Sequence, residues 1–98
     1  MDICRVDSNQ AEIVKKLRRH KELSVWDTHT VGRGFPDIIV GIDNAFNPLF
    51  EIKKDWKSKL TPAEIKFKET WKGEYYAIFT YEQACFHLGI KPMKGEKI

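Results

Sequence analysis

Apolar residues recur along the chain with two spacings, one typical of helices and one typical of strands. Ile13 and Leu17 lie on one stripe at helical spacing, which predicts an amphipathic helix near the start of the chain. Ser8 or Asn9 can cap this helix at its N-terminus. We expect the helix to run to about Lys21 and to become basic toward its end.

Three apolar segments rich in β-forming residues follow this helix and predict strands. Residues 23–30 form the first, and residues 37–42 form a near-continuous apolar run that is typical of a strand buried on both faces. Residues 49–53 form the third. The polar turn 43–48 joins the last two segments, so we expect them to pair as an antiparallel hairpin.

The second half of the chain contains the clearest local signal. Thr61 and Glu64 have the spacing of a capping box, and Pro62 occupies the first helical position. A helix is therefore expected to begin here and to end near Gly73. Trp71 has helical spacing from the preceding apolar residues, which predicts that it joins the core.

A strand over residues 75–80 and a short helix over 81–88 that ends at Gly89 complete the predicted elements. Their order is α-β-β-β-α-β-α, which predicts an α/β fold with a mixed four-stranded sheet flanked by helices. A chain of 98 residues and 11.5 kDa has the size of one domain, so residues 1–98 are expected to fold as a single unit. Residues 91–98 are polar and are expected to form a flexible tail.

Composition excludes several classes of protein. Hydrophobic residues at 42% and charged residues at 32% are typical of a globular chain. The sequence has no secretory signal and no apolar run of the ~20 residues that span a membrane, so no membrane partner is expected. Cys4 and Cys85 are far apart, which argues against a disulfide framework and favours a cytoplasmic protein. The formal net charge of +3 permits a polyanionic partner.

Three polar residues interrupt the apolar strands and carry the candidate chemistry. Asp37 opens the second strand, while Glu51 and Lys53 lie two apart in the third and so point to one face. A hairpin centred near Asn44 sets Asp37 opposite Glu51 on that face. Pro48 leaves the register open, because it can force a bulge or a longer loop.

Two carboxylates in a half-buried site repel each other and need a compensating cation. Oxygen ligands of this kind suit Mg²⁺, or Mn²⁺ in its place. A bound divalent ion lowers the pKa of its water and stabilises charge in phosphoryl transfer. Lys53 lies on the same face as Glu51 and can orient the water or neutralise that charge. The residue types therefore predict hydrolysis of a phosphodiester by a metal-activated water.

The spacing of these residues resembles a known nuclease signature. Pro36 and Asp37, followed fourteen positions after Asp37 by Glu51, Ile52 and Lys53, resemble the PD-(D/E)XK motif. The flanking sequence resembles the small stand-alone VRR-NUC nucleases of phages and bacteria. The stretches that carry this likeness are residues 9–14, 29–37, 60–64 and 71–73, within a resemblance that covers 9–88.

The resemblance implies a restriction-endonuclease-like core and a metal-dependent DNA endonuclease that acts as a homodimer on branched DNA, including four-way (Holliday) junctions. It implies that Asp37 and Glu51 bind the metal, with the backbone carbonyl of Ile52 as an additional ligand. It also implies that Lys53 is the catalytic lysine. Such a protein acts in the cytoplasm of a bacterial cell, or of the host when a phage encodes it.

The resemblance also places a polar residue of the first helix near the metal, and two residues qualify. Gln10 lies on the inward stripe of the helix, whereas Glu12 has the better metal-binding chemistry. We favour Gln10 by geometry and keep Glu12 as the alternative. Many relatives carry glutamine where this chain has Glu64, so the resemblance does not carry over a substrate contact to that position.

Basic residues gather after the third strand. Residues 53–72 contain seven lysines against three acidic residues. Lys54, Lys57 and Lys59 follow the proposed catalytic strand directly, and we expect them to contact DNA phosphates. A solvated helix face is the alternative explanation of the basic runs. Trp56 lies among these lysines and is expected to be exposed, where it can meet DNA or a second subunit.

Other functions remain compatible with the same sequence. Asp37 can brace the glycine-rich turn before it, and Glu51 with Lys53 can form an exposed ion pair of little energetic value. The chain would then be a non-catalytic DNA-binding module. A nuclease of the same fold that acts on linear DNA or on RNA is the other alternative.

Overall fold

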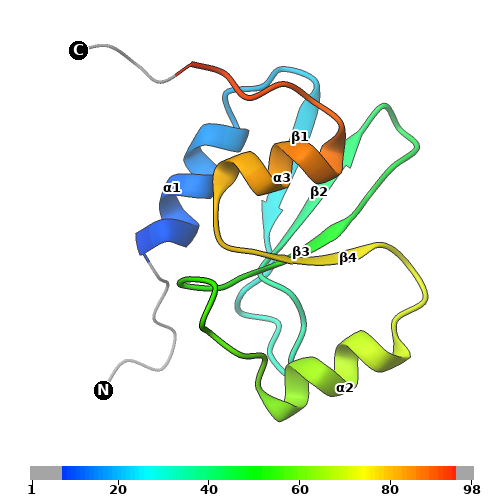
Figure 1. The fold of residues 1–98 in the computed structure, drawn as a ribbon. Helices are drawn as coiled ribbons and strands as arrows, with labels where there is room; N and C mark the ends of the chain where they lie inside the picture. Colours follow the sequence, from blue (N-terminus) through cyan, green and yellow to red (C-terminus); the bar gives the residue numbers. More distant parts are fainter. Residues whose placement is uncertain (1–7, 95–98) are drawn as a thin grey trace.

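The computed structural model describes residues 8–94, and its elements follow the predicted order (Figure 1). In chain order they are α1 (Ser8–Leu17), β1 (Leu23–Asp27), β2 (Ile38–Ile42), β3 (Leu49–Ile52), α2 (Pro62–Thr70), β4 (Tyr75–Ile78) and α3 (Tyr81–Leu88). The predicted mixed α/β class is therefore confirmed. Cys4 and the last four residues of the predicted tail lie outside the described residues.

The four strands form one mixed sheet in the order β1-β2-β3-β4. Strands β1, β2 and β3 pair antiparallel, and β4 pairs parallel to β3. All four residues of β3 are buried, whereas buried and half-buried residues alternate along β2. The prediction that β2 is buried on both faces is therefore wrong. The second face of the sheet is open beside Ile39, where the paired Trp26 on β1 is 71% exposed.

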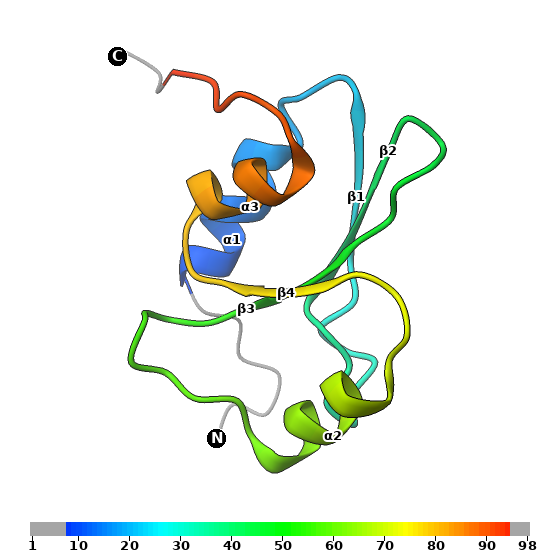
Figure 2. The ribbon, with the colours of Figure 1, turned by 45° about the vertical axis from the view of Figure 1, so that its right-hand side comes forward.

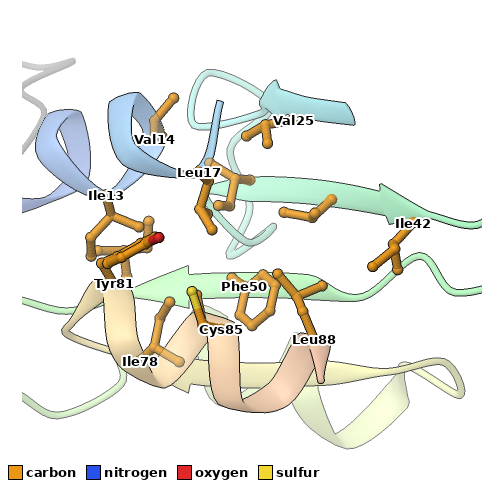
Figure 3. Packing of buried hydrophobic residues seen from close by; sticks show 14 residues of the cluster. Ile13, Val14, Leu17, Val25, Ile42, Phe50, Ile78, Tyr81, Cys85 and Leu88 are labelled. Carbon is orange, nitrogen blue, oxygen red and sulfur yellow. The ribbon is translucent and has the colours of Figure 1, made fainter. Parts of the chain in front are cut away.

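The main core lies between the sheet and the two helices α1 and α3. These helices lie together on one side of the strands, and α2 lies apart from them (Figures 1 and 2). Leu17, Phe50 and Cys85 are fully buried in this layer, which Figure 3 shows from close by. Burying a side chain of the size of Leu17 or Phe50 stabilises the fold by about 1.5–3 kcal/mol. This layer fixes the positions of β2 and β3, whose ends carry the candidate residues Asp37, Glu51 and Lys53.

Helix α2 covers part of the other face and contributes no buried residue. Its capping box is formed as predicted, with Thr61 accepting from the Glu64 N–H and Glu64 accepting from the Thr61 N–H. Phe67 attaches the helix to the sheet, with ring centroids 5.2 Å from Phe35 and 6.0 Å from Tyr75. The helix therefore depends on few apolar contacts and on its polar ones.

The prediction that Trp71 joins the core is wrong. Its side chain is 42% exposed and stacks on Phe67, with 5.4 Å between ring centroids. The helix ends at Thr70, and Trp71 has extended backbone angles, so its side chain leaves the helical stripe. The spacing from Phe67 indicated the neighbour of Trp71 correctly but not its burial.

The boundaries of α1 and β1 also differ from the predicted ones. Helix α1 ends at Leu17 rather than near Lys21, since His20 turns inward, is 4% exposed and hydrogen-bonds Tyr81 at 2.6 Å. Strand β1 ends at Asp27, whose carboxylate accepts from the His29 N–H at 2.9 Å and turns the chain. Among the described residues, no helix has the length and apolar character needed to span a bilayer.

The part of the tail that the structure describes, residues 91–94, has no regular structure. The N–H of Met93 nevertheless donates to the Tyr81 hydroxyl at 2.9 Å, which ties this part of the tail to α3.

Gly34 sets the approach of α2 to the turn before β2, and we expect Gly34→Ala to be strongly destabilising. Gly34 has φ +81°, and an added Cβ would overlap the backbone of Ala63 and Glu64 in the first turn of α2. Gly32 has φ +83° and open space around it, so Gly32→Ala is a matched control for backbone strain alone. We expect a loss of about 2–4 kcal/mol for Gly34→Ala and about 1 kcal/mol for Gly32→Ala in urea unfolding. Equal losses would contradict a steric role for Gly34.

Candidate functional site

Asp37, Glu51 and Lys53, here called the polar face, lie at the end of the β2–β3 hairpin where β2 begins. Ile38 pairs with Phe50 and Ile39 with Leu49, which centres the hairpin near Asn44 as predicted and places Asp37 and Glu51 next to the last pair of the ladder. The N–H of Asp37 donates to Phe50 O at 3.0 Å, and the N–H of Ile52 donates to Asp37 Oδ2 at 2.8 Å. The Asp37 carboxylate is therefore fixed by the backbone of β3. Pro48 does not disturb the register, because its carbonyl accepts the N–H of Val40 at 3.1 Å.

Lys53 follows β3 and points to the same site. Its Nζ donates to Glu64 Oε1 at 2.7 Å and lies 3.7 Å from Glu51 Oε2. The same Glu64 oxygen accepts the N–H of Thr61 at 2.8 Å. The capping box of α2 therefore also anchors the lysine of the site.

Glu64 is the residue that the sequence reasoning missed as part of this site. Its spacing predicted a cap, and no local pattern indicates that the first turn of α2 meets the end of β3. This is a tertiary contact, and it depends on the turn at Gly34 and on the loop after Lys53. A glutamate eleven positions after a lysine carries no such signal by itself.

Asp37, Glu51, Lys53 and Glu64, here called the cluster, contain more acidic than basic side chains. Glu51 is 3% exposed, and burial together with the carboxylates of Asp37 and Glu64 raises its pKa to about 9. Burial also raises the pKa of Asp37, against the hydrogen bond from Ile52. Burial alone would raise the pKa of Glu64, but its bonds to Lys53 and Thr61 lower it below the ordinary value. Three carboxyl groups thus lie around the Lys53 ammonium, and this crowding together with burial favours the protonated form of Glu51.

This arrangement makes the stability of the metal-free protein depend on pH. Because the folded-state pKa of Glu51 is raised, the unfolded chain loses this proton first, near pH 4.5. The contribution of Glu51 is full below that pH and is lost as the pH rises toward 9. We expect Glu51→Gln in EDTA to be more stable than wild type by on the order of several kcal/mol at pH 8, with no such gap at pH 4.

Thermal unfolding across pH measures this gap. Glu12→Gln is the matched control, because Glu12 is an exposed carboxylate on α1 and should produce no pH-dependent gain. Parallel pH profiles for wild type and Glu51→Gln would contradict the buried, protonated state of Glu51.

A polar cavity of about 260 Å³ opens at this cluster. It is lined by Gln10, Asp37, Glu51, Ile52, Lys53, Lys54, Ser58 and Glu64. Two buried polar atoms among these residues have no hydrogen-bond partner, Glu51 Oε1 and Gln10 Nε2. Unpartnered buried polar atoms are costly, so they indicate room for a ligand with polar groups.

Helix α1 contributes Gln10 and not Glu12 to the cavity. Gln10 is 4% exposed and faces inward on the stripe of Ile13. Glu12 is exposed and forms an ion pair with Lys16 at 2.9 Å. Two residues along a helix correspond to a rotation of about 200°, so the two side chains cannot share one face. The geometry therefore excludes Glu12 as a ligand at this site.

The three lysines predicted to contact DNA are placed differently. Lys54 lines the cavity, whereas Lys57 lies above the Trp56 ring with its Nζ 5.8 Å from the ring centroid. Lys59 is exposed and does not line the cavity. The structure thus brings one of the three to the cluster and leaves two on the adjoining surface.

The donor set of the site is small. Among residues 8–94, no three His, Cys, Asp or Glu side chains form a group able to hold a metal ion. Asp37 and Glu51 are two carboxylates, and Mg²⁺ is commonly bound by one or two carboxylates while it keeps several waters. Glu51 Oε1 has no hydrogen-bond partner, so its lone pairs are available to coordinate an ion. A half-turn of the Gln10 amide would present its oxygen at the position of Nε2. The residues present therefore fit a hydrated divalent ion better than a fully protein-bound one.

Comparison with protein-family models, curated proteins and solved structures gives no match for this chain.

Proposed function

We propose that this chain is a metal-dependent endonuclease that hydrolyses phosphodiester bonds in DNA, with a core of the restriction-endonuclease type. The observation that carries the proposal is the convergence of Asp37, Glu51 and Lys53 beside one polar cavity. Burying charged groups at one place costs stability, and apolar side chains would serve a purely structural role better. A chemical role explains why the cluster is present.

Asp37 and Glu51 would hold a Mg²⁺ ion, with Mn²⁺ able to replace it. The Ile52 N–H points at Asp37, and the carbonyl of a strand residue points to the same side as its N–H. This supports the Ile52 carbonyl as a further ligand. Gln10 lines the same cavity and is the candidate for an outer contact. When bound, the ion supplies an activated water and stabilises charge on the phosphate.

Lys53 would supply positive charge to the phosphate under attack. Its ammonium is held by Glu64 and is near Glu51, so it is preorganised at the point where negative charge develops. Glu64 touches Lys53 and the backbone of Thr61, and acts through them as a positioning residue. Asp37 is held in turn by the Ile52 N–H. The Asp37 carboxylate is thus oriented by the backbone of β3, and Lys53 is oriented through Glu64 by the N-cap of α2.

We propose branched DNA, such as a four-way junction, as the substrate and a homodimer as the active form. The resemblance to VRR-NUC nucleases supports both. A chain of 98 residues offers little surface for reading bases, so recognition of shape through phosphates is favoured. Symmetric cutting of two strands needs two sites, which a two-fold dimer supplies. The proposed place of action is the cytoplasm.

Cleavage of a labelled four-way junction beside a linear duplex tests the proposal. The assay is run with Mg²⁺, with Mn²⁺ and with EDTA, on wild type and on Asp37→Asn. We expect cutting in either metal, none in EDTA and preference for the junction. Metal-dependent cutting of the linear duplex at the same rate would keep the chemistry and overturn the proposed substrate. Salt-sensitive binding by both proteins without cutting would favour the non-catalytic binding module.

A further inference from the structure

An exposed tryptophan lies beside the proposed active site. Trp56 is 74% exposed and belongs to the loop between β3 and α2, here called the Trp56 loop (residues 54–60). Single exposed apolar residues are common and need no explanation by themselves. Three further observations distinguish this one, and they concern the rigidity, the position and the charge of the loop.

Hydrogen bonds within the Trp56 loop and from α1 hold the loop in place. Asp55 Oδ1 accepts three hydrogen bonds, from the Lys57 N–H at 2.9 Å, the Ser58 N–H at 3.1 Å and the Ser58 hydroxyl at 3.2 Å. At the start of the loop, Asn9 Nδ2 donates to the Lys53 carbonyl at 2.6 Å. The loop that carries Trp56 is therefore already ordered in the free protein. Binding of a ligand would cost less conformational entropy than binding to a disordered loop.

The loop borders the cavity of the site. Lys54 and Ser58, each two residues from Trp56, line the same cavity as Asp37 and Glu51. Two residues of extended chain span at most about 7 Å, so the Cα of Trp56 lies within that distance of both lining residues. Stacked nucleotides of one strand are about 3.4 Å apart, so a base one to three nucleotides from the cleaved phosphate is within reach.

The charge of the loop favours a polyanion over a second copy of this chain. Residues 54–60 contain three basic residues, Lys54, Lys57 and Lys59, and one acidic residue, Asp55. A second copy carries the same net charge of +3 and the same basic loop. Close approach of two such surfaces would be repulsive, whereas DNA phosphates would neutralise them.

We propose that Trp56 stacks on an unpaired base next to the cleaved phosphate. This inference rests on the proposed nuclease function and narrows its substrate class to DNA with unpaired bases at the cut, as in single strands, splayed ends or open branch points. In an intact duplex the faces of each base are covered by its neighbours, so an aromatic side chain needs an unpaired base. Trp56 is thus a specificity-determining residue.

The first test is binding without metal. Wild type, Trp56→Ala and Trp56→Phe are titrated in EDTA with a labelled oligothymidylate of about 12 nucleotides and with a matched duplex. We expect Trp56→Ala to weaken single-strand binding roughly 5- to 100-fold and duplex binding little, with Trp56→Phe between the two. Trp26→Ala is the matched control, because Trp26 is 71% exposed but lies on β1.

The second test reads the contact directly. The chain has three tryptophans, so a Trp26→Phe, Trp71→Phe variant reports the fluorescence of Trp56 alone. Quenching by the oligothymidylate, with little quenching by duplex, is the expected result. Equal quenching by both, or fluorescence that changes with protein concentration alone, would overturn stacking and favour a contact with a second copy.

The outcomes separate this inference from the proposed function. Metal-dependent cleavage with unchanged single-strand binding in Trp56→Ala would overturn the role of Trp56 and leave the nuclease in place. Loss of single-strand binding in Trp56→Ala, together with no cleavage by wild type, would support the stacking surface and contradict the nuclease.

Discussion

Replacing Asp37 with asparagine is expected to lower metal-dependent cleavage by about 10³-fold or more, with DNA affinity retained or increased. The amide of the new side chain would keep an oxygen able to accept the Ile52 N–H, so the local backbone should persist. The substitution removes one of the two carboxylates proposed to hold the ion. It also removes negative charge that repels DNA, which is why binding should not fall.

Asp43→Asn is a matched control for this prediction. Asp43 lies in the turn at the opposite end of the same hairpin, is exposed and has φ 58°, a conformation that asparagine tolerates. It removes the same charge from the chain without touching the site. Cleavage rates at saturating Mg²⁺ and binding in EDTA should separate the two variants. Equal loss of binding and cleavage in Asp37→Asn would contradict its assignment as a metal ligand.

Lys53→Ala is expected to reduce the cleavage rate by about 10²- to 10³-fold while the fold is retained. The ammonium of Lys53 lies 3.7 Å from the Glu51 carboxylate and 2.7 Å from that of Glu64. Without it the phosphate under attack would meet three carboxylates and no positive side chain at the centre of the site. The rate should therefore fall much more than the substrate affinity.

Lys54→Ala controls for the loss of positive charge. Lys54 lines the same cavity but is exposed, so its removal should weaken DNA binding modestly and depend on salt. Single-turnover rates at several salt concentrations distinguish the two lysines, with circular dichroism to verify folding. Full activity of Lys53→Ala would overturn its catalytic role.

The hairpin and its polar face could be predicted from the sequence because their determinants are local. The turn 43–48 fixes which residues of β2 and β3 lie opposite each other, and the period of two fixes the shared face of Glu51 and Lys53. The inward position of Gln10 followed in the same way from the stripe of α1. Each of these inferences uses residues of one element or of two adjacent ones.

The remaining features depend on how distant elements meet, and local pattern does not specify that. Glu64 reaches Lys53 only because α2 sits against the turn at Gly34. Trp71 has the spacing of a core residue, but α2 covers an open sheet face with little to bury it. Residues on one face of β2 are half-buried for the same reason, because α2 covers only part of that face.

The register of the β2–β3 hairpin also links assembly of the site to the order of folding events. A chain that paired these strands one residue out of step would send Asp37 and Glu51 to opposite faces, although its β-structure content would be similar. Collapsed states with slipped strands would therefore lack the two-carboxylate face. In a refolding experiment, acquisition of the proposed divalent-ion affinity would report the native strand pairing specifically, and a spectroscopic signal of secondary structure would not.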